Sequence, residues 1–521
     1  MKPLLMDRDR DFEVLSASPW NAQALTQDLG LDTLLKAMAG EDELLLEVAR
    51  KALLCGLQND LSTILYRQEV LKDALKNPEI VRGLYHLMGE VVKGSKKHTW
   101  GITSHYPSSM LYGATDLLEM LVAMLRKLRG IAEKEAGRFQ SEGFTALFAM
   151  LEKELSEEFL ASVQDHLRIS RFRKGMLLSA ELGASNESIN LILRKDPGSR
   201  QSWFDRLLGK GPPFYTYRLH ERDEAGGRIL GKIRDRGISR VATALAESAD
   251  HVLSFFKTMQ TELAFYVGCL NLYSRLGAKG EPVCFPTPAP AGERRQRFSG
   301  LYDVCLSLNM ESRVVGNLVD ADGKSLVIVT GANQGGKSSF LRSIGLAQVM
   351  MQCGMFVGAE AFQAELCPAL FTHYKREEDA AMKSGKFDEE MARMNEIVDH
   401  ITPNSMLLFN ESFSATNERE GSEIAKQIIS ALLEKRIKIF YVTHLYEFAR
   451  GLFDKQMEDA LFLRAERKGD GTRTFRLLEG EPLETSYGAD LYRQIFNANA
   501  QFRNGEPAKE IVDTIADEQH D

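Results

Sequence analysis

The sequence has little of what marks secreted, membrane-spanning or metal-binding chains. Its 521 residues include only six cysteines, which are scattered and form no C-x-x-C pair, so neither a disulfide framework nor a zinc site is expected. No apolar run reaches the roughly 18 residues of a membrane span, and the N-terminal stretch lacks a signal-peptide core. Excess positive charge is also missing, because the formal net charge is −8. These absences predict a reduced, cytoplasmic protein with no membrane partner, in which any contact with nucleic acid uses a local basic surface.

The clearest motif lies at residues 325–341, which read SLVIVTGANQGGKSSFL. The apolar run at 326–329 suits a buried strand, and residues 339–351 favour a helix. Between them, residues 331–338 match G-x-x-x-x-G-K-[ST], the pattern of a phosphate-binding P-loop. In such a loop backbone N–H groups point at phosphate oxygens, the lysine (Lys337) reaches the β- and γ-phosphates, and the next serine (Ser338) holds magnesium. A chance glycine-rich turn is the alternative, and the strand–loop–helix order argues against it.

Two further apolar runs end in polar residues that suit nucleotide chemistry. Residues 406–409 predict a buried strand that is followed by Asn410 and Glu411. In P-loop ATPases the first residue of such a pair supports magnesium and the second orients the attacking water. His444 follows the apolar run at 437–442 and is a candidate sensor of the γ-phosphate. An ordinary histidine at a strand end is the alternative for His444.

Six elements in this order resemble the MutS family of DNA mismatch-repair ATPases. The loop TGANQGGKSS at 330–339 is similar to the family's TGPNMGGKST, and a generic ABC-type or SMC-type ATPase would not share its asparagine, Asn333. The other matching elements are Gly354 with Val357 and Ala359, Phe371-Thr372-His373 for the family's F-T-R, Asn410-Glu411 through Thr416 for DE-x-GRGT, Thr443-His444 for T-H, and Ser486-Tyr487-Gly488 for S-Y-G.

The motifs and the resemblance together predict the site. ATP and magnesium are the expected cofactors, and ATP hydrolysis is the expected reaction. Gly331, Asn333, Gly335, Gly336, Lys337, Ser338 and Ser339 are predicted to bind the nucleotide. Ser338 and Asn410 are predicted to hold the metal, and Lys337, Glu411 and His444 to act in catalysis.

The chain departs from the family at the magnesium position and at its N-terminus. Asn410 stands where the family has aspartate, which keeps the geometry but loses a charge, so weaker metal binding and slower turnover are expected. Core-like helices begin within about thirty residues of Met1, which leaves no room for the family's mismatch-reading domain with its Phe-x-Glu wedge. Mismatch reading is therefore not expected, and neither is the C-terminal nuclease domain of some MutS relatives.

A third departure concerns the segment by which the family reaches across a dimer to the partner's ATP. Phe387 and Glu390-Met391 fit its F-x-x-E-M, but Gly385-Lys386 replaces the preceding Ser-Thr pair. Ser384 and Lys386 are the candidates to substitute for that pair. The resemblance still implies a homodimer.

Helical patterns dominate the first half of the chain. One helix is predicted to open at Glu43, and another is capped by Asp60 and stops at Asn77-Pro78. The R-Q-x-x-V segment at 67–70 resembles the MutS core domain. Two longer patterns at 115–129 and 241–276 suit lever arms, since the second would be roughly 50 Å long; an ordinary helical domain is the alternative.

Residues 194–240 are locally basic, with twelve Lys or Arg against six Asp or Glu. Residues 214–217 predict a short strand, and Gly226-Gly227 predicts a turn. In MutS proteins a clamp that closes over the DNA backbone sits here, and basic side chains suit phosphate contact. Arg228, Lys232, Arg234 and Arg236 are the candidate DNA contacts, and a solvated charged loop is the alternative.

The sequence thus predicts an α/β P-loop (ABC-type) ATPase domain preceded by an all-α core with long lever helices and a small clamp-like insertion. The predicted domains are 1–114 (helical core), 115–280 (levers, with the insertion at 194–240), 281–498 (ATPase) and 499–521 (polar tail). The expected function is a dimeric, ATP-hydrolysing clamp on duplex or branched DNA without mismatch reading. The alternative is an ATP-binding switch with negligible hydrolysis that clamps a protein or RNA-containing partner.

Overall fold

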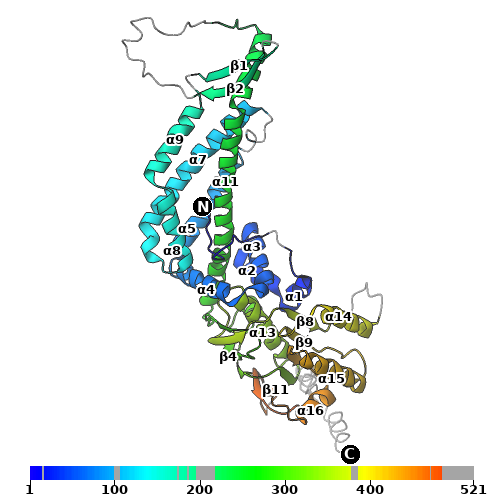
Figure 1. Ribbon diagram of the computed structural model, residues 1–521. Helices are drawn as coiled ribbons and strands as arrows, with labels where there is room; N and C mark the ends of the chain where they lie inside the picture. The colour runs from blue at the N-terminus through cyan, green and yellow to red at the C-terminus, as the bar shows by residue number, and fades with distance from the viewer. Residues whose placement is uncertain are drawn as a thin grey trace, which may run out of the picture. The chain divides into compact units, whose positions relative to one another are not determined.

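The protein divides into two compact units (Figure 1). The structure, a computed structural model, describes residues 1–14, 17–98, 102, 106–172, 175–184, 187–194, 217–376, 385–469 and 471–483. Unit 1 comprises Met1–Glu13 and Glu69–Val267, and unit 2 comprises Val14–Gln68 and Gly268–Asp521. A helical part and a mixed α/β part are therefore confirmed, whereas the domain boundaries drawn along the sequence stay predictions.

Unit 1 is built from long helices. They are α5 (Pro78–Ser95), α7 (Pro107–Glu135), α8 (Glu142–Glu154), α9 (Glu157–Ser170) and most of α11 (Glu224–Ala278), together with the 3-10 turn η2 (Ala136–Arg138). α7 packs against α5, α8 and α9, and its Leu111 shares a buried cluster with Ile238 and Ala242 of α11. Both predicted long helices are confirmed and are longer than predicted. Among the described residues, no helix has the length and apolar character to cross a membrane.

The predicted turn at Gly226-Gly227 is wrong, because both glycines lie inside α11. Asp223 accepts a hydrogen bond from the backbone N–H of Gly226 at 2.9 Å, so its carboxylate caps the helix and lets it begin at Glu224. The glycines fall in the first turn, where they weaken a helix least. The basic residues from 228 onward are therefore helical and not part of an irregular loop.

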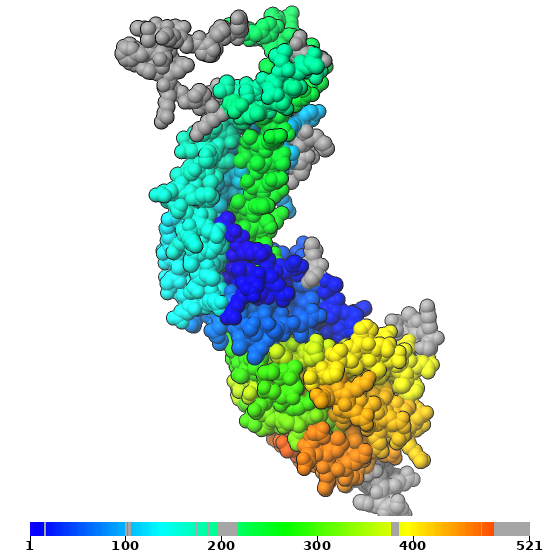
Figure 2. Space-filling model, viewed as in Figure 1, coloured from blue at the N-terminus to red at the C-terminus, as the bar shows by residue number. Residues whose placement is uncertain are grey.

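A two-stranded antiparallel sheet, which the sequence analysis missed, precedes α11. Its strands are β1 (Leu177–Leu182) and β2 (Ser188–Arg194), and most of their side chains are exposed. In Figure 2 the N-terminal part of α11 and the two strands reach the molecular surface. Of the predicted strand 214–217, only Tyr217 is described, and it lies outside any strand; the basic positions in 195–216 also fall outside the described residues.

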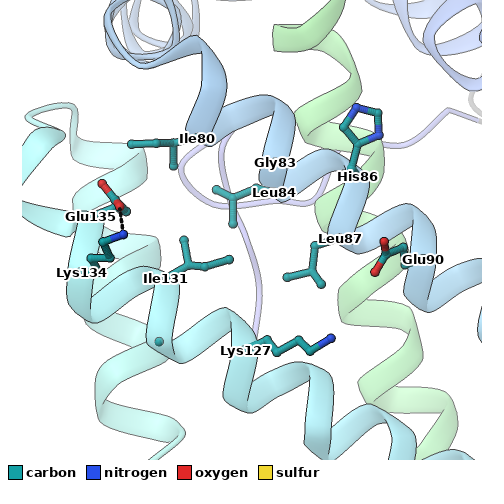
Figure 3. Close-up of a pocket in the computed structure, with 11 residues that line it drawn as sticks. Ile80, Gly83, Leu84, His86, Leu87, Glu90, Lys127, Ile131, Lys134 and Glu135 are labelled. Atoms are coloured by element: carbon teal, nitrogen blue, oxygen red, sulfur yellow. Dashed lines mark ion pairs between the residues drawn. The ribbon is translucent and has the colours of Figure 1, made fainter.

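A groove of about 600 Å³ runs between α5 and α7 (Figure 3). Leu84 and Leu87 point into it from α5, and Ile131 points into it from α7. Glycines at positions 83 and 130 line the groove as well, and a side chain added at either would meet no atom within 4 Å. The missing side chains leave the two helices incompletely packed here.

The N-terminal residues of unit 1 are held by a buried glutamate of α11. Glu262 accepts hydrogen bonds from the backbone N–H groups of Leu5 at 2.6 Å and Phe12 at 3.2 Å, and the Tyr266 hydroxyl donates to the Leu5 carbonyl. Burial nevertheless raises the pKa of Glu262 to about 7. The N-terminal segment Met1–Glu13 is therefore held by hydrogen bonds to a carboxyl group whose pKa lies near neutral pH.

This pKa predicts that unit 1 loses stability as the pH rises from about 4.5 to about 7. Above the ordinary pKa the unfolded chain releases the proton while the folded chain retains it, so deprotonation favours unfolding. The full shift corresponds to at most about 3 kcal/mol. Glu262→Gln should remove this part of the pH dependence, as measured by urea unfolding at pH 5 and pH 8. Equal pH dependence of the parent and the variant would contradict the assignment.

Unit 2 contains two sheets with helices around them. The six-stranded sheet has the order β12-β11-β6-β10-β9-β8, and the four-stranded sheet has the order β3-β7-β4-β5. The strands are β3 (Thr287–Ala289), β4 (Gln296–Leu301), β5 (Asn317–Asp320), β6 (Leu326–Gly331), β7 (Ala361–Glu365), β8 (Leu370–Tyr374), β9 (Met406–Asn410), β10 (Lys438–Val442), β11 (Ala460–Arg467) and β12 (Arg473–Glu479). The predicted buried strands are confirmed as β6, β9 and β10, which run parallel to one another.

The helices of unit 2 come from both ends of the chain. They are α1 (Ala22–Leu29), α2 (Leu31–Ala39), α3 (Glu43–Cys55), α12 (Val304–Asn309), α13 (Lys337–Gln352), α14 (Lys386–His400), α15 (Glu418–Glu434) and α16 (Tyr446–Phe453), with the 3-10 turn η1 (Gly56–Gln58). α4 (Leu61–Lys76) contributes residues to both units, as α11 does. The predicted cap of α4 is confirmed, since Asp60 accepts from the N–H of Thr63 at 2.8 Å.

The R-Q pair of α4 has a packing role in unit 2. Arg67 donates to the Cys353 carbonyl at 3.4 Å, and Gln68 donates to the Pro286 carbonyl at 3.1 Å. Gly354 has a φ of 87°, and a side chain there would lie 2.4 Å from the Cβ of Arg67. A glycine therefore lets the end of α13 approach α4.

Candidate functional site

The phosphate-binding motif adopts the predicted strand–loop–helix order. β6 is fully buried between β10 and β11, and α13 begins at Lys337. Gly331 and Gly336 have φ values of 105° and 89°, which glycine adopts readily. A side chain on Gly335 would lie 2.6 Å from the Cβ of Ala465 on β11. The glycines are thus required by backbone conformation and by close packing.

Lys337 is buried at the start of α13. Its ammonium donates to the carbonyls of Gly331 and Ala332 at 2.9 and 3.0 Å. Burial lowers the pKa of Lys337 to about 8, and the negative charge of Glu411 opposes that effect. The lysine therefore lies within the loop and within electrostatic reach of Glu411.

Ser338 and Asn410 lie in direct contact at the ends of neighbouring elements. The Ser338 hydroxyl donates to the side-chain oxygen of Asn410 at 3.1 Å. Hydroxyl and amide oxygens are the hard ligands that Mg²⁺ accepts, and Mg²⁺ usually keeps several waters and binds phosphate oxygens as well. The pair therefore fits a magnesium ion, although it supplies no negative charge.

Glu411 and His444 form the second part of the site. The Glu411 carboxylate lies 3.2 Å from His444 Nε2, and both side chains are about one-third exposed, at 34% and 31%. The hydrogen bond from His444 lowers the pKa of Glu411 more than burial raises it. Glu411 is thus a carboxylate at neutral pH, oriented by the histidine.

A mostly apolar cavity of about 300 Å³ adjoins the loop. Gly336 and Ser339 of the loop region belong to its wall, and Asn317 fixes the far side, because its amide oxygen accepts from the N–H of Leu477 on β12 at 2.8 Å. The apolar lining residues are Leu301, Leu306, Met310, Val314, Val315, Phe340 and Phe475. The sequence analysis missed this cavity because its lining comes from separate segments without a motif.

The remaining predicted residues lie on the loop, at the start of α14 or outside the described residues. Asn333 is exposed on the loop, where its carbonyl accepts from Arg473 at 3.2 Å. Gly385 is the N-cap of α14. Ser384 and the Ser486-Tyr487-Gly488 motif fall outside the described residues.

The candidate DNA contacts lie on α11 in unit 1. Arg228, Lys232 and Arg236 are exposed and recur every four residues, so they share one face of the helix, which Arg240 continues. We call these four residues the basic stripe. Arg234 is not part of it, because its guanidinium donates to the Tyr112 hydroxyl at 2.7 Å and lies over that ring.

Comparison with known families finds matches in both units. The family model for the MutS2 N-terminal domain matches residues 59–279, and the model for MutS domain V matches residues 327–503. The second match contains the phosphate loop, Asn410, Glu411 and His444. The chain belongs to the MutS family.

Individual MutS relatives match parts of the chain. The DNA mismatch repair protein MutS of Leptospira interrogans is 31% identical over 170 residues, which cover 30% of this chain and 20% of that protein. The endonuclease MutS2 of Thermus thermophilus is 26% identical over 234 residues, which cover 45% of this chain and 29% of that protein. The mouse MutS protein homolog 4 is 29% identical over 167 residues, which cover 32% of this chain and 17% of that protein. The matched segments thus span less than a third of each of these relatives.

Proposed function

We propose that this MutS family protein binds ATP with magnesium at the phosphate loop and hydrolyses it. The observation that carries the proposal is the placement of the Glu411–His444 pair, 3.2 Å apart, beside the loop lysine, on which the Glu411 charge acts. A P-loop provides phosphate binding, and an oriented carboxylate provides the water-directing group that hydrolysis needs.

Each residue has one task in the proposed reaction. Lys337 and the loop N–H groups stabilise negative charge on the phosphates, and Ser338 with Asn410 holds the magnesium. Magnesium, when bound, neutralises charge on the phosphate oxygens. Glu411 accepts a hydrogen bond from the attacking water, and His444 keeps that carboxylate oriented and ionised.

The hydrolytic proposal is preferred to the switch with negligible turnover. Asn410 favours the switch, because an amide holds magnesium less firmly than a carboxylate would. The carboxylate and the histidine needed for hydrolysis are nevertheless in hydrogen-bonding contact, which a chain that only binds ATP would not require.

The apolar cavity beside the loop is proposed to receive the base of ATP. It borders Gly336 and Ser339 and has the mostly apolar lining typical of such sites. Val315→Asp should place a charge in the cavity and weaken ATP binding by about tenfold or more. Leu318→Asp is the matched control, because Leu318 is 72% exposed on nearby β5 and does not line the cavity. Equal ATP affinity of the two variants in a fluorescent-nucleotide titration would contradict the proposal.

The proposed partners are DNA and a second copy of the chain. The basic stripe suits sequence-independent contact with phosphates, since cations at regular spacing match a charged backbone rather than base edges.

The homodimer is proposed from the start of α14. This part of the chain corresponds to the segment with which MutS proteins are expected to contact the nucleotide of the partner subunit. ATP should therefore promote a homodimer, and light scattering that finds only monomer at micromolar Glu411→Ala protein with ATP would argue against it.

A further inference from the structure

The turn that carries Glu411 has an unfavourable backbone conformation. Glu411 and Phe413 have φ values of 54° and 62°, in the left-handed region that glycine adopts far more readily. Non-glycine residues stay in this region only where their surroundings hold them. The turn directly after β9 therefore depends on neighbouring groups for its shape.

Ser412, between these two residues, makes three contacts that help to hold the turn. Its hydroxyl lies 2.7 Å from Nδ1 of His373 and 2.6 Å from the His373 carbonyl. Its own carbonyl accepts from the Tyr441 hydroxyl at 2.7 Å. Gly421 permits the same geometry, because a side chain there would lie 2.3 Å from the Phe413 carbonyl oxygen.

His373, at the end of β8, connects this turn to α14. Its Nε2 lies 3.0 Å from the Glu390 carbonyl, and its ring stacks on Phe413 with a centroid separation of 5.4 Å. The Glu390 carbonyl can only accept, so Nε2 carries the proton of the neutral ring, and Nδ1 shares the single Ser412 hydroxyl proton with the His373 carbonyl. Burial, together with the charge of Arg393, lowers the pKa of His373 to about 4, which agrees with this neutral form.

Glu390 adds a second link between α14 and the turn. Its carboxylate is buried near the backbone N–H groups of Phe413 and Ala415, which lower its pKa less than burial raises it, and neither oxygen has a hydrogen-bond partner among the described residues. α14 thus contacts the turn through its own Glu390 and through His373. A shift of α14 would change the support of both sides of Ser412.

We propose that His373 and Ser412 form a positioning pair that sets the orientation of Glu411 and couples it to the position of α14. The inference rests on the proposed hydrolytic role of Glu411 and adds two residues that do not touch the nucleotide. His373 stands where the family's F-T-R motif has arginine, so the pair belongs to this chain's own sequence.

The test compares ATP turnover and ATP affinity in Ser412→Ala, His373→Gln and the double variant. Each single change should lower kcat on the order of tenfold to a hundredfold, because a small displacement of a catalytic group has effects of this size. The dissociation constant for ATP should stay within about twofold of the parent value, since neither residue contacts the phosphate loop. If the two act as one unit, the double variant should be no slower than the slower single variant.

Two further variants separate positioning from general damage. Ser412→Thr keeps the hydroxyl and should retain kcat within about threefold. Ser422→Ala removes another buried hydroxyl of unit 2, for which the described residues offer no hydrogen-bond partner, and should leave kcat unchanged. If His373→Gln does not fold, the contrast between Ser412→Ala and Ser412→Thr decides the matter.

The outcomes distinguish the inference from the proposed function. Full activity in Ser412→Ala, multiplicative losses in the double variant, or an equal loss in Ser422→Ala would overturn the positioning pair while leaving ATP hydrolysis intact. A parent protein whose ATP hydrolysis does not depend on Lys337 would overturn the proposed function and the inference together.

Discussion

The Glu411→Ala variant is expected to bind ATP as tightly as the parent protein and to hydrolyse it at least about a hundredfold more slowly. The carboxylate is held ionised by His444, so its removal takes away the group that directs the attacking water. ATP binding depends on the loop and on Lys337, which this change leaves in place. Steady-state hydrolysis and nucleotide titration of the same protein measure the two effects separately.

Two companion variants sharpen the result. Glu434→Ala removes an exposed carboxylate at the end of α15 and should hydrolyse ATP like the parent. Asn410→Asp restores a charge beside Ser338 and should lower the magnesium concentration needed for half-maximal activity. Parent-like turnover in Glu411→Ala would show that another group positions the water.

Reversing the charge of the basic stripe should weaken DNA binding strongly and flatten its salt dependence. Each cation that contacts a phosphate contributes about −0.9 to the slope of log K against log salt, so Arg228, Lys232, Arg236 and Arg240 together account for roughly −3.6. Sequence and mismatches should have little influence on affinity, because phosphate contacts carry no base information. Filter binding or anisotropy at several salt concentrations measures the slope directly.

The matched control reverses four exposed lysines of the same unit that lie off the stripe: Lys93, Lys127, Lys134 and Lys153. It alters the net charge equally, so a comparable loss would point to general repulsion instead of a contact surface. Basal ATP hydrolysis should stay unchanged in both variants, since none of these residues belongs to the site. A parent protein that binds no DNA of any shape at about 50 mM salt would favour the switch.

The site was largely predictable from the sequence because its residues lie in short motifs at strand ends. β6, β9 and β10 are parallel neighbours, so the carboxyl ends that bear the loop, Glu411 and His444 must meet at one edge of the sheet. The roles of these residues stay predictions, but their proximity followed from three buried apolar runs.

Features that are built from residues of distant segments could not be predicted from the sequence. The cavity beside the loop joins residues from α12, the segment before β5, α13 and β12. His373 and Ser412 are 39 residues apart in the sequence, and the departure of His373 from the family's F-T-R did not by itself indicate its contact with Ser412. The start of α11 was misplaced for a different reason: two glycines predicted a turn at 226–227, and Asp223 was not recognised as a cap.

The most direct test of the central claim is a calorimetric titration of the parent protein and its Lys337→Ala variant with ATP and magnesium. The account predicts saturable binding of one nucleotide per chain by the parent and loss of binding in the variant. The reason is that the ammonium of Lys337 supplies the positive charge with which the loop binds the phosphates. A parent that binds no ATP, or a variant that binds it as tightly as the parent, would contradict the account.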